Sequence, residues 1–382
     1  RVSMEELKKR KDAVVEELRA GIEKQLAAAK VDLYRGTGVV CGEHLVKVMP
    51  GEEEVTADYI LLAAGSEPSS LPIPGMDLPG VKNSTQMLEE ECVPDRLVII
   101  GGGVIGMEFA TVYNDLGCQV TVLEAMDKIL PGMDKEISQN LKMIMKKRGV
   151  DIHTGATVSS VEKMGDGTYL CRYTEKEKNC EAPAALILSA VGRRPLSRGL
   201  FSEDMQERIE MEGGRVLVNE RYETSVPGIY AIGDLIGGVC LAHVAAAEGC
   251  QAASAMFPEL KGKDMTVIPS CVYTDPEIAC AGLTADEAKA AGIDTATGKY
   301  IMSVNGKSVL SMQDRGFLKI VSEKETGRIL GAQLMCARAT DMIGELELAI
   351  SKRLTAEDLA AVIMPHPTFC EGIGEAAESI LM

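Results

Sequence analysis

The chain has 382 residues, 46% of them apolar and 25% charged, which is the composition of a globular protein with two or three domains. A formal net charge of −17 and the lack of basic blocks interleaved with aromatic residues argue against nucleic acid or anionic membranes as partners. The longest nearly apolar run, residues 182–192, is too short to cross a bilayer, and the opening does not resemble a secretory signal. We therefore expect a cytoplasmic protein.

The eleven cysteines are spread along the chain. None of them has C-x-x-C spacing, and the nearest pairs are Cys171 with Cys180 and Cys271 with Cys280. This pattern predicts reduced, mostly buried thiols, with neither a metal site nor a disulfide framework.

Residues 3–30 predict a long amphipathic helix, because apolar residues recur at helical intervals and Ser3 and Glu6 have capping-box spacing. Short β-rich pieces follow at 31–40 and 44–49, and then an apolar strand runs into a small-residue turn at 58–68. The Pro-rich segment 68–80 predicts a crossover between domains.

Residues 95–195 predict a βαβ unit with additions. Strand, glycine turn, helix and strand follow one another up to Glu124, and a longer helix, hairpin-like pieces and a further strand complete the segment. This order is typical of a parallel-sheet nucleotide-binding domain.

Residues 215–234 then return to β structure before a small-residue helix at 242–257, and from about 265 strands and helices predict an α+β domain. The predicted domains are 1–94 with 196–264, 95–195, and 265–382.

The first chemical motif is G-x-G-x-x-G, formed by Gly101, Gly103 and Gly106 directly after a strand and at the start of a helix. The glycines permit a tight turn, a close approach to a pyrophosphate and helix packing on the strand. Glu124 ends the next strand, where a carboxylate binds ribose hydroxyls and repels a 2′-phosphate. This pattern favours NAD over NADP, and the alternative is a structural βα turn with an incidental Glu.

The second motif is "TSVPGIYAIGD", in which Asp234 follows a strand and a glycine and precedes a helix. An acid at such a position can bind a polyol or ribityl chain. An N-cap role for Asp234 is an equally good interpretation of these residues.

The third motif is the tail "HPTFCE", in which His366 and Glu371 are five apart with a proline on each side of the His. The prolines exclude one regular helix, so a loop has to fold the Glu back for the two to touch. A carboxylate-bound His can serve as an acid or base near neutral pH, whereas an exposed His near a Glu is often inert. His44 and His153 lie in strand-like pieces without a predicted role.

Taken in order, "GGGVIGMEFA" with Glu124, "AVGRRP", "TSVPGIYAIGD", "LAHVAAAEG", "PSCVYTDPEIACAGLT" and "HPTFCE" resemble the flavin-dependent pyridine nucleotide-disulfide oxidoreductase family, and within it the dihydrolipoamide dehydrogenases. The resemblance covers essentially the whole chain. It implies an α/β fold in which a Rossmann-like NAD domain is inserted in the remnant of an FAD-binding domain, followed by an α+β dimerisation domain. It also implies FAD and NAD as cofactors, a homodimer, and a dithiol substrate such as dihydrolipoamide on a carrier domain.

The resemblance further implies roles for single residues. His366 would be the base that deprotonates the dithiol, oriented by Glu371, and both would act on the flavin of the partner subunit. The implied FAD-binding residues are Ala64, Gly65, Ser66, Asp234, Cys240, Leu241, Ala242 and His243. Val158 and Gly192 would line the NAD site with Gly101, Gly103, Gly106 and Glu124, and Glu108 would lie near the flavin and nicotinamide.

Three parts that family members carry have no counterpart in these 382 residues. They are a G-x-G-x-x-G for the ADP half of FAD, a redox cysteine pair separated by four residues, and a Lys that pairs with the position of Glu108. We therefore expect the C-terminal portion of such an oxidoreductase, with sequence missing before Arg1, lacking the redox cysteines and without turnover by itself.

Two alternatives remain open from the sequence. One is a catalytically incomplete fragment that binds NAD and dimerises, against which the intact "HPTFCE" argues. The other is a related oxidoreductase, such as a metal-ion or coenzyme A disulfide reductase. Glu124 argues against NADPH-dependent relatives, which need a cation there.

Overall fold

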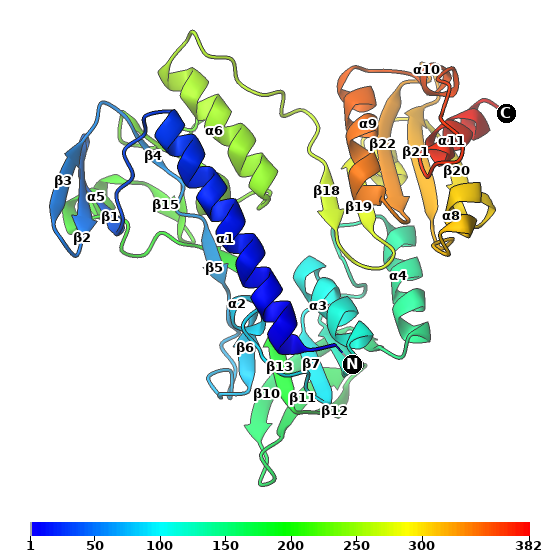
Figure 1. Cartoon of the computed structure of the whole chain (residues 1–382), viewed down its shortest axis with the longest axis horizontal. Helices are drawn as coiled ribbons and strands as arrows, with labels where there is room; N and C mark the ends of the chain where they lie inside the picture. The colour runs from blue at the N-terminus through cyan, green and yellow to red at the C-terminus, as the bar shows by residue number, and fades with distance from the viewer. Residues whose placement is uncertain (1) are drawn as a thin grey trace. The chain divides into compact units, whose positions relative to one another are not determined.

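The computed structural model describes residues 2–382, which form two compact units. Unit 1 comprises residues 2–69, 85–92 and 192–264, and unit 2 comprises residues 70–84, 93–191 and 265–382 (Figure 1). The chain thus leaves unit 1 and later returns to it. The expectation about sequence before Arg1 lies outside the described residues.

Unit 1 combines short strands with helices. Its elements are α1 (Met4–Ala28), β1 (Thr37–Gly42), β2 (Leu45–Met49), β3 (Glu53–Thr56), β4 (Ile60–Leu62), β5 (Ser66–Pro68), β14 (Arg193–Pro195), α5 (Glu203–Arg208), β15 (Met211–Glu212), β16 (Arg215–Val216), β17 (Ile229–Ala231), the 3₁₀ helix η1 (Gly233–Leu235) and α6 (Ala242–Met256). The short helix α2 (Ser84–Met87) begins at the last residue of the first unit 2 segment.

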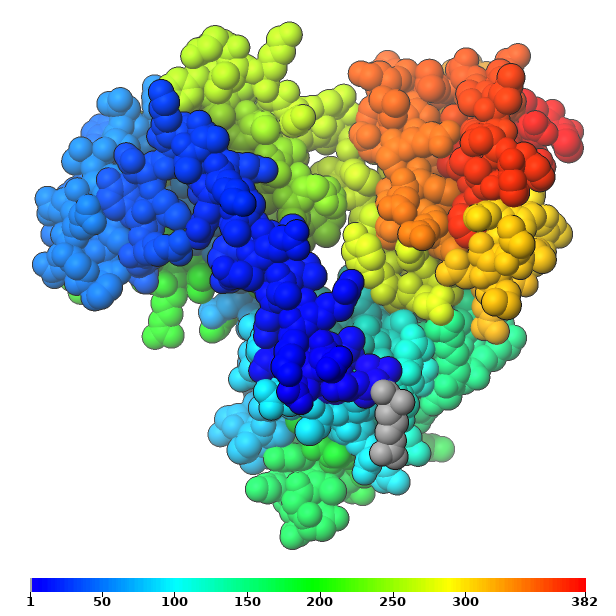
Figure 2. Space-filling view, in the orientation of Figure 1, coloured from blue at the N-terminus to red at the C-terminus, as the bar shows by residue number. Residues whose placement is uncertain are grey.

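The predicted long helix at the start of the chain is confirmed as α1. The Ser3 hydroxyl accepts a hydrogen bond from the Glu6 N–H at 3.3 Å, as a capping residue does. None of the helix residues is buried, and Figure 2 shows α1, in dark blue, uncovered along the face in view. Capping and helix propensity define α1, because burial contributes little to it.

The β structure predicted from residue 31 begins later than expected. Residues 31–36 form no strand, and β1 starts at Thr37, where it pairs with β2 in an antiparallel meander with β3. At Gly36 an added Cβ would lie 2.4 Å from the Met49 carbonyl oxygen. The chain therefore passes so close to its neighbour at this point that only glycine fits.

A parallel pair forms the centre of unit 1. β4 pairs with β17, with Ile60 opposite Ile229 and Leu62 opposite Ala231, and all four side chains are buried. The carboxyl ends of parallel strands meet at one edge of a sheet. Residues just after 62 and just after 231 are therefore brought together although they are distant in sequence.

Unit 2 contains three sheets with helices. Its elements are β6 (Val81–Asn83), β7 (Arg96–Ile100), α3 (Val104–Asp115), β8 (Gln119–Glu124), α4 (Lys135–Lys147), β9 (Asp151–Thr154), β10 (Ala156–Lys163), β11 (Tyr169–Glu175), β12 (Lys178–Ala184), β13 (Leu186–Ser189), β18 (Ser270–Val272), β19 (Ile278–Gly282), α7 (Ala285–Ala290), β20 (Thr295–Ile301), η2 (Met302–Val304), α8 (Gly306–Leu310), β21 (Phe317–Glu323), β22 (Ile329–Met335), α9 (Ala339–Ser351), α10 (Ala356–Ala360) and α11 (Glu371–Leu381).

The predicted βαβ unit is confirmed in the first sheet of unit 2. Its five strands run parallel in the order β6-β13-β7-β8-β9, and α3 packs on β7 and β8. The antiparallel sheet β10-β11-β12 shares a core with it, in which Val98, Leu123 and Ile187 are buried. The predicted α/β class is therefore present.

The third sheet of unit 2 is antiparallel, with the order β18-β19-β22-β21-β20. All residues of β22 and nearly all of β21 are buried, because α9 packs on β19 and β22 while α11 packs on β20 and β21 (Figure 1). This α+β arrangement agrees with the prediction, and it places the tail of the chain against a rigid sheet.

Two further findings concern the class of protein. No helix among residues 2–382 is both long and apolar enough to cross a membrane.

All eleven cysteines are free, but only Cys118, Cys171 and Cys336 are buried, whereas Cys92 and Cys240 are exposed. The expectation of mostly buried thiols is wrong, because many cysteines lie in short edge segments and loops rather than in the cores.

Candidate functional site

The predicted His–Glu pair is in contact at the C-terminal end of unit 2. Glu371 is the first residue of α11, and the loop before this helix folds back so that His366 Nδ1 lies 2.7 Å from Glu371 Oε1. The His366 side chain is 77% exposed, whereas that of Glu371 is 22% exposed. The His366 imidazole is therefore accessible.

Thr368 holds the carboxylate of this pair. Its N–H donates to Glu371 Oε2 at 2.8 Å, and its hydroxyl donates to the Pro365 carbonyl oxygen at 2.7 Å. The Thr368 N–H and the His366 ring together hold the pKa of Glu371 below its ordinary value. Because the carboxylate accepts, Nδ1 carries the proton of the neutral imidazole, and Nε2 has a lone pair that can take a proton.

The glycine motif forms a tight turn between β7 and α3. Gly101 has φ +108°, and an added Cβ there would lie 2.4 Å from the Ala190 carbonyl oxygen. At Gly106 a Cβ would lie 2.0 Å from the Gly101 carbonyl oxygen, whereas at Gly103, the N-cap of α3, it would meet open space. The turn is therefore closed on the protein side and open at the helix N-terminus, which fits a pyrophosphate.

Glu124 lies beside this turn and is 7% exposed. Its Oε2 accepts from the Gly102 N–H at 2.5 Å, and its Oε1 accepts from the Met126 N–H at 2.7 Å. A carboxylate has about four lone-pair positions, so roughly two remain for the hydroxyls of a ribose. The residues present fit the adenosine half of a nicotinamide dinucleotide.

Asp234 lies in unit 1 at the edge formed by β4 and β17. It sits in η1, and its Oδ2 accepts a hydrogen bond from the Ser66 hydroxyl. Arg193 donates to both Ser66 Oγ and the Ser66 carbonyl oxygen at 2.7 Å, and its Nε lies 3.9 Å from Asp234 Oδ2. The N-cap interpretation of Asp234 is wrong, because Leu241 precedes α6 and Ile232 precedes η1.

The other residues expected at the FAD site come from two segments of unit 1, one shortly after Asp234 and one after β4. Leu241 is the N-cap residue of α6, and Ala242 and His243 form its exposed first turn. Cys240 as a whole residue is exposed. Partial burial of its thiol, together with the neighbouring Asp234, raises the pKa of that thiol. Ala64 and Gly65 follow β4, and Gly65 has φ +73°. The exposed first turn of α6 lies against η1, which carries the Asp234 carboxylate, and this arrangement fits the ribityl and diphosphate part of a flavin.

Three predicted residues lie elsewhere in the two units. Glu108 in α3 accepts from the Tyr273 N–H at 2.9 Å, and burial raises its pKa although this hydrogen bond opposes the rise. Val158 is a buried residue of β10, with its side chain in the core of unit 2. Gly192 belongs to unit 1, has φ +107°, and its carbonyl oxygen accepts from the Ser69 N–H.

The sequence analysis missed two residues that support the site. Thr368 stands between His366 and Glu371 and bonds to the segments on both sides of itself, as described above. Glu248, buried in α6, accepts from the Gly233 N–H at 2.6 Å, and burial raises its pKa. Both lie inside quoted motifs, Thr368 in "HPTFCE" and Glu248 in "LAHVAAAEG", but their residue types are common and no local pattern assigns them a role.

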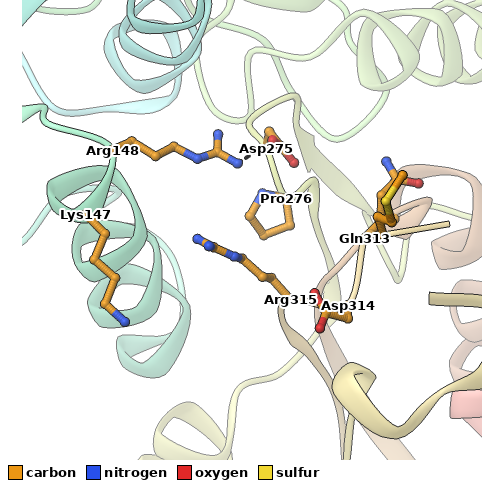
Figure 3. Close-up of a pocket in the computed structure, with 9 residues that line it drawn as sticks. Lys147, Arg148, Asp275, Pro276, Gln313, Asp314 and Arg315 are labelled. Atoms are coloured by element: carbon orange, nitrogen blue, oxygen red, sulfur yellow. Dashed lines mark hydrogen bonds and ion pairs between the residues drawn. The ribbon is translucent and has the colours of Figure 1, made fainter. Parts of the chain in front are cut away.

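A pocket of about 400 Å³ in unit 2 lies apart from these residues (Figure 3). It is lined by Lys147, Arg148, Asp275, Pro276, Met312, Gln313, Asp314, Arg315 and Ala337. Arg148 points across it toward Asp275, with which it forms an ion pair (Figure 3). In this view Pro276 lies between the ion pair and Arg315. Cations at the end of α4 also complement the helix dipole. The charges of this pocket therefore have a structural explanation, and none of the predicted site residues lines it.

Comparison with known proteins identifies the family models that match. The model of the pyridine nucleotide-disulphide oxidoreductases matches residues 2–249. The model of the dimerisation domain of these oxidoreductases matches residues 268–377. The resemblance and the α/β fold with a following dimerisation domain are thereby confirmed.

Curated relatives match nearly the whole chain. A dihydrolipoyl dehydrogenase of Bacillus subtilis (strain 168) is 37% identical over 394 residues, covering 98% of this chain and 82% of the relative. A second one from this organism is 40% identical over 373 residues, covering 96% and 78%. A dihydrolipoamide dehydrogenase of Chaetomium thermophilum is 36% identical over 382 residues, covering 99% and 76%.

Solved structures share the architecture. LpdA from Mycobacterium tuberculosis matches with a TM-score of 0.91 at 27% identity, covering 100% of this chain and 84% of its own. The HOCl-induced flavoprotein disulfide reductase RclA from Escherichia coli matches with a TM-score of 0.89 at 27% identity, covering 97% and 85%.

Proposed function

The chain belongs to the pyridine nucleotide-disulphide oxidoreductase family, and from this premise we propose that its residues serve the oxidation of dihydrolipoamide by NAD⁺. It is a dihydrolipoamide dehydrogenase-like oxidoreductase. In the balanced reaction, dihydrolipoamide and NAD⁺ give lipoamide, NADH and H⁺. The dithiol is free or attached to a carrier domain.

The contact of His366 Nδ1 with Glu371 is the observation that carries the proposal. A dithiol has to lose protons before its sulfurs react, because the thiolate is the nucleophile. With Nδ1–H bound to Glu371, His366 Nε2 accepts the thiol proton, and the carboxylate stabilises the imidazolium that results. Thr368 keeps the carboxylate in place during this transfer.

The family uses FAD and a nicotinamide dinucleotide, which when bound supply the electron transfer from dithiol to NAD⁺. In this proposal Gly101, Gly103, Gly106 and Glu124 of unit 2 hold the dinucleotide, together with Val158, and Glu108 stands near the nicotinamide. Glu124 favours NAD because its charge repels a 2′-phosphate. Asp234 and Ser66 hold the flavin, with Ala64, Gly65, Cys240, Leu241, Ala242 and His243 along it.

The matched dimerisation domain supports a homodimer. In the proposal, His366 and Glu371 of one subunit act at the flavin of the partner subunit. Exposure of the His366 side chain in the single chain is consistent with this arrangement, because a second surface has to bring the dithiol and flavin to it.

His366→Gln tests the proposal in the FAD-loaded holoenzyme. NADH formation from dihydrolipoamide should fall by about 10²–10⁴-fold, the range for loss of a general base. Diaphorase activity, in which NADH reduces an artificial acceptor through the flavin, needs no dithiol deprotonation and should change little. His44→Gln, far along the sequence in the turn between β1 and β2, is the matched control and should leave both rates unchanged.

Two outcomes would count against the proposal. Equal losses of both activities in His366→Gln would make His366 a structural residue. A holoenzyme that carries FAD and binds NAD⁺ but forms no NADH from the dithiol would favour the incomplete NAD-binding, dimer-forming fragment instead.

A further inference from the structure

The loop that carries His366 has few anchors of its own. Residues 361–363 and 365–367 are exposed. Pro365 and Pro367 flank the histidine and have no N–H to donate, although the Pro365 carbonyl oxygen accepts from the Thr368 hydroxyl. Thr368 supplies the first N–H after His366, and Glu371 already takes it.

A buried side chain from another part of unit 2 holds this loop from behind. Asn305, which is 2% exposed, donates from Nδ2 to the Thr368 carbonyl oxygen at 3.0 Å. Its Oδ1 accepts from the Ser308 N–H at 2.9 Å, so that Asn305 is also the N-cap residue of α8. One amide group thus joins the start of α8 to the loop.

These contacts form a continuous series of hydrogen bonds. Asn305 holds the carbonyl of Thr368, the Thr368 N–H holds one oxygen of Glu371, and the other oxygen of Glu371 holds His366 Nδ1. The first member is buried and the last is exposed. The series therefore restrains the exposed His366 side chain through hydrogen bonds that begin at a buried residue of unit 2.

We propose that Asn305 is a positioning residue that fixes the tautomer and orientation of His366 through Thr368 and Glu371. The proposed catalytic consequence rests on the function proposed above, but the positioning itself does not. Without the Asn305 donor, the Thr368 carbonyl loses its partner from α8, the loop moves, and Glu371 no longer keeps the proton on Nδ1.

The test is a histidine NMR experiment on the protein as it exists. The sequence has four histidines, so selective ¹⁵N labelling gives few signals, and His366→Gln assigns the one of interest. In the wild type, neutral His366 should carry its proton on Nδ1. In Asn305→Ser, which keeps an N-cap oxygen for α8 but cannot reach Thr368, this form should cease to dominate, and the Thr368 amide should exchange about fivefold faster, as for loss of one hydrogen bond.

A second variant and an internal control separate positioning from folding. Asn305→Asp keeps the shape and the N-cap oxygen but replaces the donor by an acceptor, so it should release His366 at least as far. The ring nitrogens of His153 in β9 lie 2.7 Å from Glu175 and 2.9 Å from Asp151, and the ¹⁵N signals of this ring should not change in either variant.

An unchanged His366 signal and Thr368 exchange rate in both variants would overturn the proposal. So would a parallel loss of the His153 and His366 signals in both, because Asn305 would then support the fold alone. The readout needs no turnover, so failure of the proposed dithiol activity would not affect it.

Discussion

Glu124 uses its carboxylate in two ways. Two backbone amides hold it in place beside the glycine turn, and its remaining lone pairs would accept from the hydroxyls of the proposed ribose. Glu124→Ala should weaken NADH binding by about ten- to a hundredfold, because hydrogen bonds to a charged group contribute about 1.5–3 kcal/mol. Titration of NADH fluorescence measures the dissociation constant.

Asp127→Ala is the matched control for this substitution. Asp127 is an exposed carboxylate three residues further on, outside the proposed dinucleotide site, and its loss should leave the dissociation constant unchanged. Equal affinities in Glu124→Ala and the wild type would remove the cofactor assignment of Glu124.

Protonation of His153 should make the free energy of unfolding depend on pH. Burial lowers its pKa, but hydrogen bonds to Asp151 and Glu175 outweigh burial, so the pKa in the folded protein is raised. The stabilisation is then complete below the unfolded value of about 6.5 and is lost as pH rises through the folded value. Urea unfolding should show that His153→Gln lowers the free energy of unfolding more in mildly acidic than in mildly alkaline solution. A difference independent of pH would contradict this prediction.

For single residues, the sequence predicted the reactive pair His366 and Glu371 but not Asn305, which holds their loop in place. His366 and Glu371 are five residues apart, and the prolines that exclude a helix between them are visible in the sequence. Asn305 lies 63 residues before Thr368, and a buried amide gives no periodic signal. Which backbone carbonyl it meets depends on how β20 and α8 pack beside α11.

Among the elements, β21 and α4 are joined by a buried ionic cluster in unit 2. Lys319 of β21 is 8% exposed and lies 2.8 Å from both oxygens of Asp134, the N-cap residue of α4, and 3.2 Å from Glu136. Lys319→Ala leaves a buried carboxylate without its cation and should lower the free energy of unfolding by about 3–5 kcal/mol.

Lys299→Ala is the matched control for that element contact. Lys299 of β20 also pairs with Glu136, but both side chains are partly exposed, so its loss should cost less than about 1 kcal/mol. Urea unfolding of the two variants checks the difference. Equal losses would show that burial of Lys319 does not set the strength of the cluster.

The elements also differ in how far the sequence predicts them. The start of α1 and the βαβ unit around Gly101 follow from local capping, periodicity and turn residues. The strand expected at residues 31–36 is absent, since a strand exists only where a neighbour pairs with it. No local pattern indicates that β4 pairs with β17, more than 160 residues away.

For the whole molecule, the predicted state is a homodimer. Several large apolar side chains of the region matched by the dimerisation model are exposed in the single chain, among them Val304, Leu310 and Ile363, and burial of such surface drives association. Sedimentation velocity at micromolar concentration should give the mass of two chains. A monomer under these conditions would contradict the shared His366 site.

The sequence by itself determined the glycine turn with Glu124, the αβ order of residues 95–195 and the pairing partners His366 and Glu371, because each is encoded within about thirty residues. Only the tertiary structure decided that Ser66 meets Asp234 and that Asn305 reaches Thr368. Both contacts join distant segments through the packing of sheets and helices. Such packing depends on the whole core at once, so no short stretch of residues specifies it.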